Sequence, residues 1–230
     1  MHWKLAVKRA IPPSILNNTL LTFPFLYRTP LVNYETTLTE HNGVADLLDQ
    51  LGKACGLPGD IIECGSSRCG ASVLMADFLR ARQIAKIVYA YDSFSGFDRD
   101  ELEREQEADL TRVSDKAFTS TSYAYVKAKI KTLGFEGAIV PVQGYFETTL
   151  PAIQSTFCFA LIDCDLKDSM VYCAETIWPH LASNGRIVFD DYTSDDFKGA
   201  RLGVDLFVQK YRNEINEHGL LNRLYLVQKQ

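Results

Sequence analysis

The sequence has no long apolar run, no basic excess and no cysteine or histidine spacing typical of a metal site. None of its 230 residues lies in a stretch approaching the roughly 20 apolar residues of a membrane span. Lys and Arg number 24 against 29 Asp and Glu, a net charge of −5 that lacks the basic footprint of nucleic-acid binders. We therefore expect neither a membrane span nor a nucleic-acid partner.

The cysteines and histidines also lack the spacings of known metal-binding or catalytic motifs. None of the six cysteines forms a C-x-x-C pair, and several lie within apolar runs. The four histidines share no mutual spacing, and no G-x-S-x-G elbow is present. These observations argue against a zinc site and a serine hydrolase. They favour reduced, mostly buried thiols in a reducing compartment, so we expect a cytoplasmic protein.

What the sequence does contain is an alternation of strand-like and helix-like segments. Apolar residues make up 47% of the chain and charged residues 23%, as in soluble globular domains. Helices are expected at 40–56, 71–82, 122–133, 170–181 and 199–216, and strands at 61–64, 86–91, 138–142, 157–162, 186–189 and 224–228. This pattern predicts an α/β, doubly wound, Rossmann-like and mostly parallel sheet with helices on both faces.

Two segments do not fit the alternation. Residues 1–35 are irregular and proline-interrupted, without a clean signal-peptide cleavage site, and we interpret them as an N-terminal arm or lid before a domain at 36–230. This arm could join two copies of the chain in a homodimer. Residues 98–118 are strongly charged, which indicates a solvated helix or loop or, alternatively, a mobile lid over a site.

A glycine-rich turn follows the first expected strand. It runs from Glu63 to Gly70 and lacks the middle glycine of the dinucleotide fingerprint G-x-G-x-x-G. An acid just before the first glycine suits a ligand that carries a cationic amine. Asp92 ends the next expected strand, where a carboxylate can accept hydrogen bonds from both hydroxyls of a ribose. An ordinary strand-to-helix turn and a surface aspartate are the alternatives, but together the two motifs favour a nucleoside cofactor.

Acidic residues also end two later strands. Asp163 and Asp165 follow one strand, and Asp190 and Asp191 follow another. Neighbouring strands lie about 4.8 Å apart, so these carboxylates would crowd together unless protonated or bridged by a cation. Oxygen-only ligands favour Mg²⁺, with Mn²⁺ or Ca²⁺ as alternatives. We expect Asp163, Asp190 and Asp191 to be the ligands; alternatively, some of the acids cap helices, as Asp165 could.

The same motifs resemble the macrocin O-methyltransferase (TylF-type) family of class I S-adenosylmethionine-dependent enzymes. The resemblance covers roughly residues 35–230 and is carried by segments 59–72, 92–97, 143–151, 162–166 and 188–205. It implies a seven-stranded class I methyltransferase fold and Mg²⁺-assisted methyl transfer to a hydroxyl of a sugar or other small natural-product acceptor. Departures from the family pattern lie at Ser67, Cys69, Cys164 and Lys167.

The resemblance also implies roles for individual residues. Glu63 and Gly65 would hold the methionine end of S-adenosylmethionine, Asp92 the ribose, and Gly144 with Tyr145 the adenine. The cofactor-binding set is completed by Ser66, Gly70, Ser72, Ser93 and Asp163.

The proton of the acceptor hydroxyl needs a base. We expect Asp163 or Lys167 to take it, although Lys167 could equally be a solvated charge. Three alternatives stay open: a metal-independent methyltransferase acting on N or O, a non-catalytic S-adenosylmethionine-binding protein, and a nicotinamide-dependent oxidoreductase.

Overall fold

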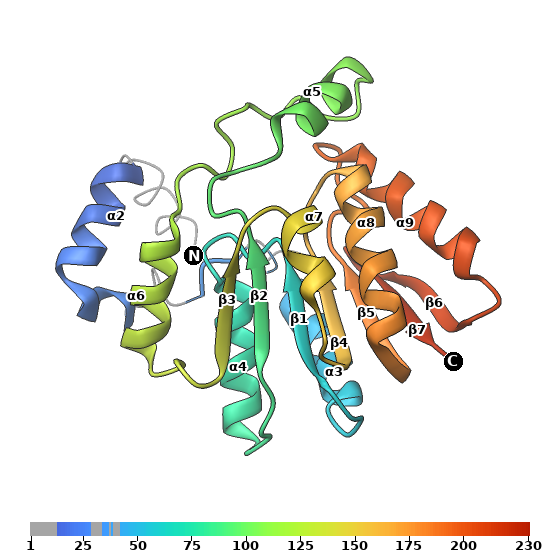
Figure 1. Ribbon diagram of the computed structural model, residues 1–230, viewed down its shortest axis with the longest axis horizontal. Helices are drawn as coiled ribbons and strands as arrows, with labels where there is room; N and C mark the ends of the chain where they lie inside the picture. The colour runs from blue at the N-terminus through green and yellow to red at the C-terminus, as the bar shows by residue number, and fades with distance from the viewer. Residues whose placement is uncertain (1–12, 29–33, 37, 39–41) are drawn as a thin grey trace.

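A seven-stranded sheet forms the centre of the molecule. The computed structural model describes residues 13–28, 34–36, 38 and 42–230. The strands are β1 Asp60–Cys64, β2 Val88–Asp92, β3 Ile139–Gln143, β4 Phe157–Ile162, β5 Leu181–Phe189, β6 Ile215–Leu221 and β7 Leu224–Lys229. Their order is β3-β2-β1-β4-β5-β7-β6. The first five strands run parallel, and β7 is antiparallel to β5 and β6 (Figure 1). The expected doubly wound, mostly parallel sheet is confirmed.

Helices cover both faces of this sheet. The helices of the described residues are α2 Pro13–Thr22, α3 Gly43–Ala54, α4 Gly70–Ala81, α5 Arg99–Glu107, α6 Tyr123–Leu133, α7 Phe146–Thr149, α8 Lys167–Ile177 and α9 Lys198–Tyr211, with 3₁₀ turns η1 Pro24–Arg28, η3 Leu150–Ala152 and η4 Trp178–His180. Of these, α2 packs on α6, and α5 lies beyond the end of the sheet (Figure 1). Side chains alternate across each strand, so Ile61 joins the core under α3, α4 and α6, whereas Ile62 joins the core under α8 and α9. Along the described residues, no helix has the length and apolar character needed to cross a membrane.

The carboxyl ends of neighbouring strands are aligned at the point where the strand order reverses. Strands β1 and β4 are neighbours, and successive strands lie outward from them on both sides, which makes this the switch point of the sheet. Cys64 pairs with Ile162, which pairs with Phe189. The ladder continues beyond the strands, because the Asp163 amide donates to the Cys64 carbonyl at 2.8 Å. The loops after β1, β4 and β5 therefore begin side by side.

The C-terminal part of the fold differs from the prediction. Helix α9 ends at Tyr211 rather than at residue 216, and the strand β6 follows, which the sequence did not predict. Strand β6 is an edge strand with β7 as its partner, and most of its side chains are exposed or half-buried. An edge strand of this kind needs no apolar run, so its polar sequence does not show a strand pattern.

The N-terminal segment is more regular than predicted. Helix α2 and the turn η1 lie within the stretch interpreted as irregular, and both contact α6. Tyr27 anchors this contact, since its fully buried hydroxyl donates to the Tyr125 carbonyl at 3.2 Å. The boundary at residue 35 between an arm and the main domain stays a prediction.

The ends of α8 also differ from the prediction. It begins at Lys167 and ends at Ile177, where the sequence predicted residues 170–181. Pro179 explains the early end, because it has no backbone N–H to continue the helical hydrogen bonds, and the chain continues as the 3₁₀ turn η4. All six cysteines are free, and five of them are buried, as expected.

Candidate active site

A cleft of about 1010 Å³ opens at the carboxyl ends of the parallel strands. Loops that follow β1, β2, β3, β4 and β5 all contribute to its lining. Nine of the ten residues predicted to bind the cofactor line it: Glu63, Gly65, Ser66, Gly70, Asp92, Ser93, Gly144, Tyr145 and Asp163. The tenth, Ser72, is buried in the first turn of α4.

The turn between β1 and α4 forms the floor of the cleft. Gly65 has a φ of 89°, and a Cβ at this position would overlap the backbone oxygen of Asp163. Glycine is therefore required where the loops after β1 and β4 touch. Gly70 has the same function toward the N-terminal segment, because a Cβ there would overlap the Glu35 backbone oxygen.

Glu63 is a buried carboxylate beneath this turn. Only 1% of the residue is exposed, and the Ser72 hydroxyl donates a hydrogen bond to its carboxylate. Burial raises the pKa of Glu63 to about 7, although the bond from Ser72 opposes the shift. A buried, readily protonated carboxylate at this place is suited to a cationic ligand group, whose charge would favour ionisation.

Asp92 at the end of β2 is fixed by backbone donors. The Ser67 amide donates to one carboxylate oxygen at 2.8 Å, and the Phe94 amide donates to the other at 2.5 Å. Each oxygen keeps a further lone pair for a ligand hydroxyl. The Gly144 amide donates to the Asp92 carbonyl at 3.0 Å, which brings the loop of Tyr145 alongside.

A buried ionic network joins the N-terminal segment to this side of the cleft. The Lys129 ammonium, which is fully buried, lies 3.0 Å from Glu35 Oε2 and donates to the Arg68 carbonyl at 2.9 Å. The Arg68 guanidinium lies 3.1 Å from Glu35 Oε1 and donates to the Ser120 carbonyl at 2.7 Å. The Tyr125 hydroxyl donates to Glu35 at 2.5 Å. Glu35 and Arg68 both line the cleft, so this network shapes it.

We did not predict this network from the sequence. Its signal is the position of Lys129, four residues after Tyr125 and three after Val126 on the buried face of α6. A lysine at such a position indicates a buried acidic partner.

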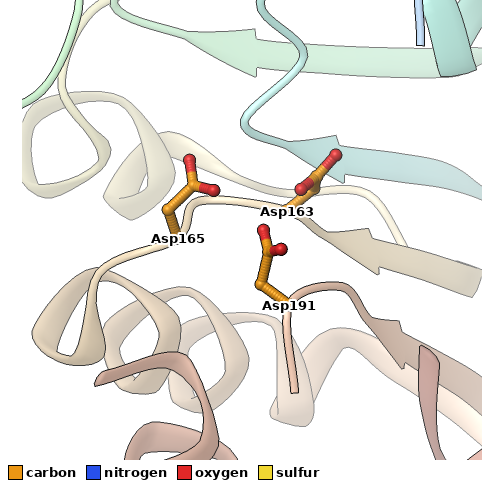
Figure 2. Close-up of side chains that lie close together, drawn as sticks. All are labelled: Asp163, Asp165 and Asp191. Carbon is orange, nitrogen blue, oxygen red and sulfur yellow. The ribbon is translucent and has the colours of Figure 1, made fainter. Parts of the chain in front are cut away.

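Three carboxylates meet at the other side of the cleft. Asp163, Asp165 and Asp191 each place an oxygen within 4.8 Å of the others (Figure 2). Asp165 and Asp191 have φ angles of 65° and 58°, a left-handed backbone conformation that is uncommon outside glycine but that aspartate adopts more readily than most residues. Burial, followed by the neighbouring acidic charges, raises the pKa of Asp163 and of Asp165. Such a set is favourable when protons or a cation lie between the carboxylates.

Asp190 is oriented differently from these three. It is fully buried, and the Arg223 guanidinium donates to both of its oxygens, at 2.9 and 2.7 Å. Arg223 lies in the turn between β6 and β7, and it is also 3.6 Å from Asp191. The structure therefore brings Asp165 into the acid cluster, where the sequence predicted Asp190. Whether these acids hold a metal stays a prediction.

Lys167 is placed outside the cleft lining. Its ammonium lies 3.2 Å from Asp168, and its backbone amide begins α8. Its role as proton acceptor stays a prediction.

Aromatic side chains form part of the cleft lining. Phe97 packs edge-on against Phe118 and Phe197, with ring centroids 5.2 and 6.1 Å apart. The three rings come from separate segments, and all of them line the cleft. The cleft therefore has an apolar surface in addition to its acid cluster.

Comparison with known proteins assigns a family. The family model Macrocin-O-methyltransferase (TylF) matches residues 41–225. The 8-demethyl-8-(2,3-dimethoxy-alpha-L-rhamnosyl)-tetracenomycin-C 4'-O-methyltransferase of Streptomyces olivaceus is 29% identical over 166 residues, which cover 66% of this chain and 62% of that protein. This match thus spans less than two thirds of that relative. Mycinamicin III 3''-O-methyltransferase of Micromonospora griseorubida is 25% identical over 181 residues, 76% of this chain and 67% of the relative.

Solved structures agree with this assignment at the level of the fold. The O-methyltransferase NovP superposes with a TM-score of 0.73 at 20% identity, covering 95% of this chain and 100% of the other. CalS11, a calicheamicin methyltransferase, gives a TM-score of 0.61 at 22% identity, covering 95% and 93%. The family match over most of the chain, together with this shared fold, leads to one conclusion: the chain belongs to the macrocin O-methyltransferase (TylF) family.

Proposed function

We propose that the protein is an S-adenosylmethionine-dependent O-methyltransferase that acts on a hydroxyl of a sugar or related natural product. The observation that carries this proposal is the contact between the two halves of the cleft. The Asp163 amide donates to Cys64, and Gly65 lies directly against the Asp163 carbonyl, so the cofactor turn and the acid cluster adjoin. The tetracenomycin and mycinamicin relatives, whose names specify O-methyl transfer, support the reaction type.

The cofactor would occupy the part of the cleft between Glu63 and Gly144. Glu63, beside Gly65, would face the amine of the methionine moiety, and Asp92 would accept hydrogen bonds from the ribose hydroxyls. Gly144 and Tyr145 would border the adenine. Ser66, Gly70 and Ser93 would complete the lining. Ser72 would orient Glu63 through the hydrogen bond that its hydroxyl donates to the Glu63 carboxylate.

A divalent cation fits the acid cluster. The donors are carboxylate oxygens alone, a set that suits Mg²⁺, Mn²⁺ or Ca²⁺. We infer that Asp163, Asp165 and Asp191 hold the cation, while Asp190 stays paired with Arg223 behind it. When bound, such an ion lowers the pKa of an acceptor hydroxyl and orients it.

The chain's own residues would complete the transfer. The acceptor oxygen forms a bond to the methyl carbon as the carbon–sulfur bond breaks, and S-adenosylhomocysteine leaves as a neutral thioether. The hydroxyl proton would pass to a carboxylate of the cluster, with Asp163 as the proposed acceptor because it adjoins the cofactor turn. Holding the two reactants in line can contribute about 7–11 kcal/mol in ideal cases. Phe97, Phe118 and Phe197 would pack against the apolar part of the acceptor.

A second candidate is methyl transfer without a metal. The pairing of Arg223 with Asp190, and its position 3.6 Å from Asp191, supplies one positive charge to the acidic region from the protein itself. A methyltransferase of this kind would be insensitive to chelators.

Calorimetry with S-adenosylhomocysteine, with and without Mg²⁺, tests the proposal. We expect micromolar binding of the nucleoside and a separate heat for Mg²⁺. An assay of methyl transfer to rhamnose-bearing acceptors, with and without EDTA, then separates the two candidates. Absence of nucleoside binding would refute both of them. The cytoplasmic location, the homodimer and the N-terminal arm stay predictions that these assays do not address.

A further inference from the structure

Helix α8 begins without a capping side chain of its own. Its N-cap residue, Leu166, offers no side-chain acceptor, although the first amides of a helix have no partner within the helix. Two glutamates of α5 take this place. Glu105 accepts from the Lys167 amide at 2.5 Å, and Glu101 accepts from the Ser169 amide at 2.8 Å and from its hydroxyl at 2.5 Å. A segment 62 residues away in the sequence therefore caps α8.

Both glutamates are buried, with 5% of Glu101 and 4% of Glu105 exposed. They are four residues apart on one helix, where like charges repel each other. The positive end of α8 offsets this repulsion, as helix N-termini do for anions. The remaining acidic residues of α5, Asp100, Glu103 and Glu107, are exposed. The segment predicted to be a solvated helix or a lid thus has one face docked against α8.

The contact extends to the loop after β5. The Lys198 amide donates to the Leu110 carbonyl at 3.0 Å, and the Thr111 hydroxyl donates to the Asp196 carbonyl at 2.8 Å. Gly199 is required here, since a Cβ at this position would overlap the carboxylate of Glu105. The residues from Glu101 to Thr111 therefore contact the first turn of α8, which follows the loop of Asp163 and Asp165, and the junction between the loop of Asp191 and α9. Figure 1 shows α5 beyond the end of the sheet where these loops lie.

We propose that Glu105 and Glu101 are positioning residues for the acid cluster. This inference rests on the proposed function, because it concerns the site where the cation and the acceptor hydroxyl would meet. Asp165 lies two residues before Lys167, in a left-handed backbone conformation. The cap at Lys167 therefore fixes the start of α8 and, through it, the loop that holds Asp163 and Asp165. The contacts of Leu110 and Thr111 fix the loop of Asp191 relative to the same segment.

The test compares Glu105→Ala, Glu105→Gln and the exposed-residue control Glu103→Ala in the full chain. Calorimetric titration with Mn²⁺ should give an affinity about tenfold lower for Glu105→Ala, the size typical of residues that orient metal ligands. Glu105→Gln keeps an oxygen for the Lys167 amide and should restore affinity to within about threefold. Glu103→Ala should match the wild type. Binding of S-adenosylhomocysteine should change less than Mn²⁺ affinity in all three variants, because the carboxylates of Glu63 and Asp92 take their hydrogen bonds from residues outside α5.

Hydrogen exchange of residues 163–170 makes the outcome independent of the metal. Glu105→Ala should exchange faster in this segment than the wild type, without a change in the turn after β1. If the wild type binds no Mn²⁺, the metal site of the proposed function is wrong, and the exchange data still decide the positioning role. Exchange in Glu105→Ala equal to that of the wild type would overturn the inference. If the wild type binds Mn²⁺, equal Mn²⁺ affinity in Glu105→Ala would also overturn it. If Glu105→Ala does not fold, Ser169→Ala, which removes one bond to Glu101, is tested in the same way.

Discussion

Glu63 should make cofactor binding depend on pH around neutrality. Burial raises the pKa of Glu63 to about 7, whereas the proposed ligand presents a cationic amine that prefers the ionised carboxylate. About 10% of Glu63 is ionised at pH 6 and about 90% at pH 8 if its pKa is 7. The affinity for S-adenosylhomocysteine should therefore fall by about tenfold from pH 8 to pH 6, with loss of binding as the pH falls.

The same shift has the opposite effect on the stability of the unliganded protein. Folding raises the pKa of Glu63 from 4.5 to about 7, so the folded state holds the proton more tightly than the unfolded chain. The linked stability is present at acid pH and is lost as the pH rises through 7. The loss corresponds to about 3 kcal/mol. Glu63→Gln should therefore stabilise the unliganded protein at pH 8 by up to about 3 kcal/mol while weakening the cofactor.

Calorimetry between pH 5.5 and 8.5, in buffers of different ionisation enthalpy, measures the affinity and the protons released on binding. We expect nearly one proton to leave near pH 6 and almost none near pH 8. Glu63→Gln should flatten the profile, whereas Glu136→Gln, an exposed residue outside the cleft lining, should not. A profile that is flat in the wild type, or one that Glu63→Gln leaves unchanged, would refute the assignment of Glu63 to the cofactor amine.

Three further predictions concern the structure around the cleft. Gly65→Ala should lower the free energy of unfolding by roughly 3 kcal/mol in urea denaturation, because its Cβ overlaps the Asp163 backbone; an unfolding midpoint equal to that of the wild type would contradict this. Lys129→Met should lower the free energy of unfolding by roughly 3–5 kcal/mol, since it removes a fully buried partner of Glu35, and a loss below about 1 kcal/mol would show that the network contributes little. Phe197→Ala should raise the KM for a sugar acceptor several-fold and leave S-adenosylhomocysteine binding unchanged in calorimetry; an unchanged KM would place the acceptor elsewhere.

Much of the fold could be predicted because the central strands are buried on both faces. The run Phe157–Ile162 is wholly buried, and such a continuous apolar segment marks an inner strand. The strand β6 could not be predicted in this way, since an edge strand is specified by its pairing with β7 more than by its own side chains. The start of α8 was misplaced for a related reason: its cap comes from α5, and no local signal at Leu166 indicates it.

The position of the candidate site could be predicted, but its detailed pairing could not. Acids at the ends of parallel strands converge in any sheet of this kind, so Asp163 and Asp191 were expected to meet. The sequence does not show which acids acquire a counter-charge inside the protein. Arg223 lies 33 residues after Asp190 and reaches it through the β6–β7 turn, which depends on the strand that was not predicted. That pairing directs Asp190 to Arg223 and leaves Asp165 beside the other two acids.

The metal site is tested most directly by titrating the S-adenosylhomocysteine complex with Mn²⁺ and monitoring the free ion by electron paramagnetic resonance. We expect one ion per chain in the wild type, with affinity lost in Asp165→Asn and kept in Asp195→Asn, which changes an exposed acid in the same loop as Asp191. A wild type that binds no ion would contradict the metal site. Wild-type affinity in Asp165→Asn would show that Asp163, Asp165 and Asp191 do not form the site together.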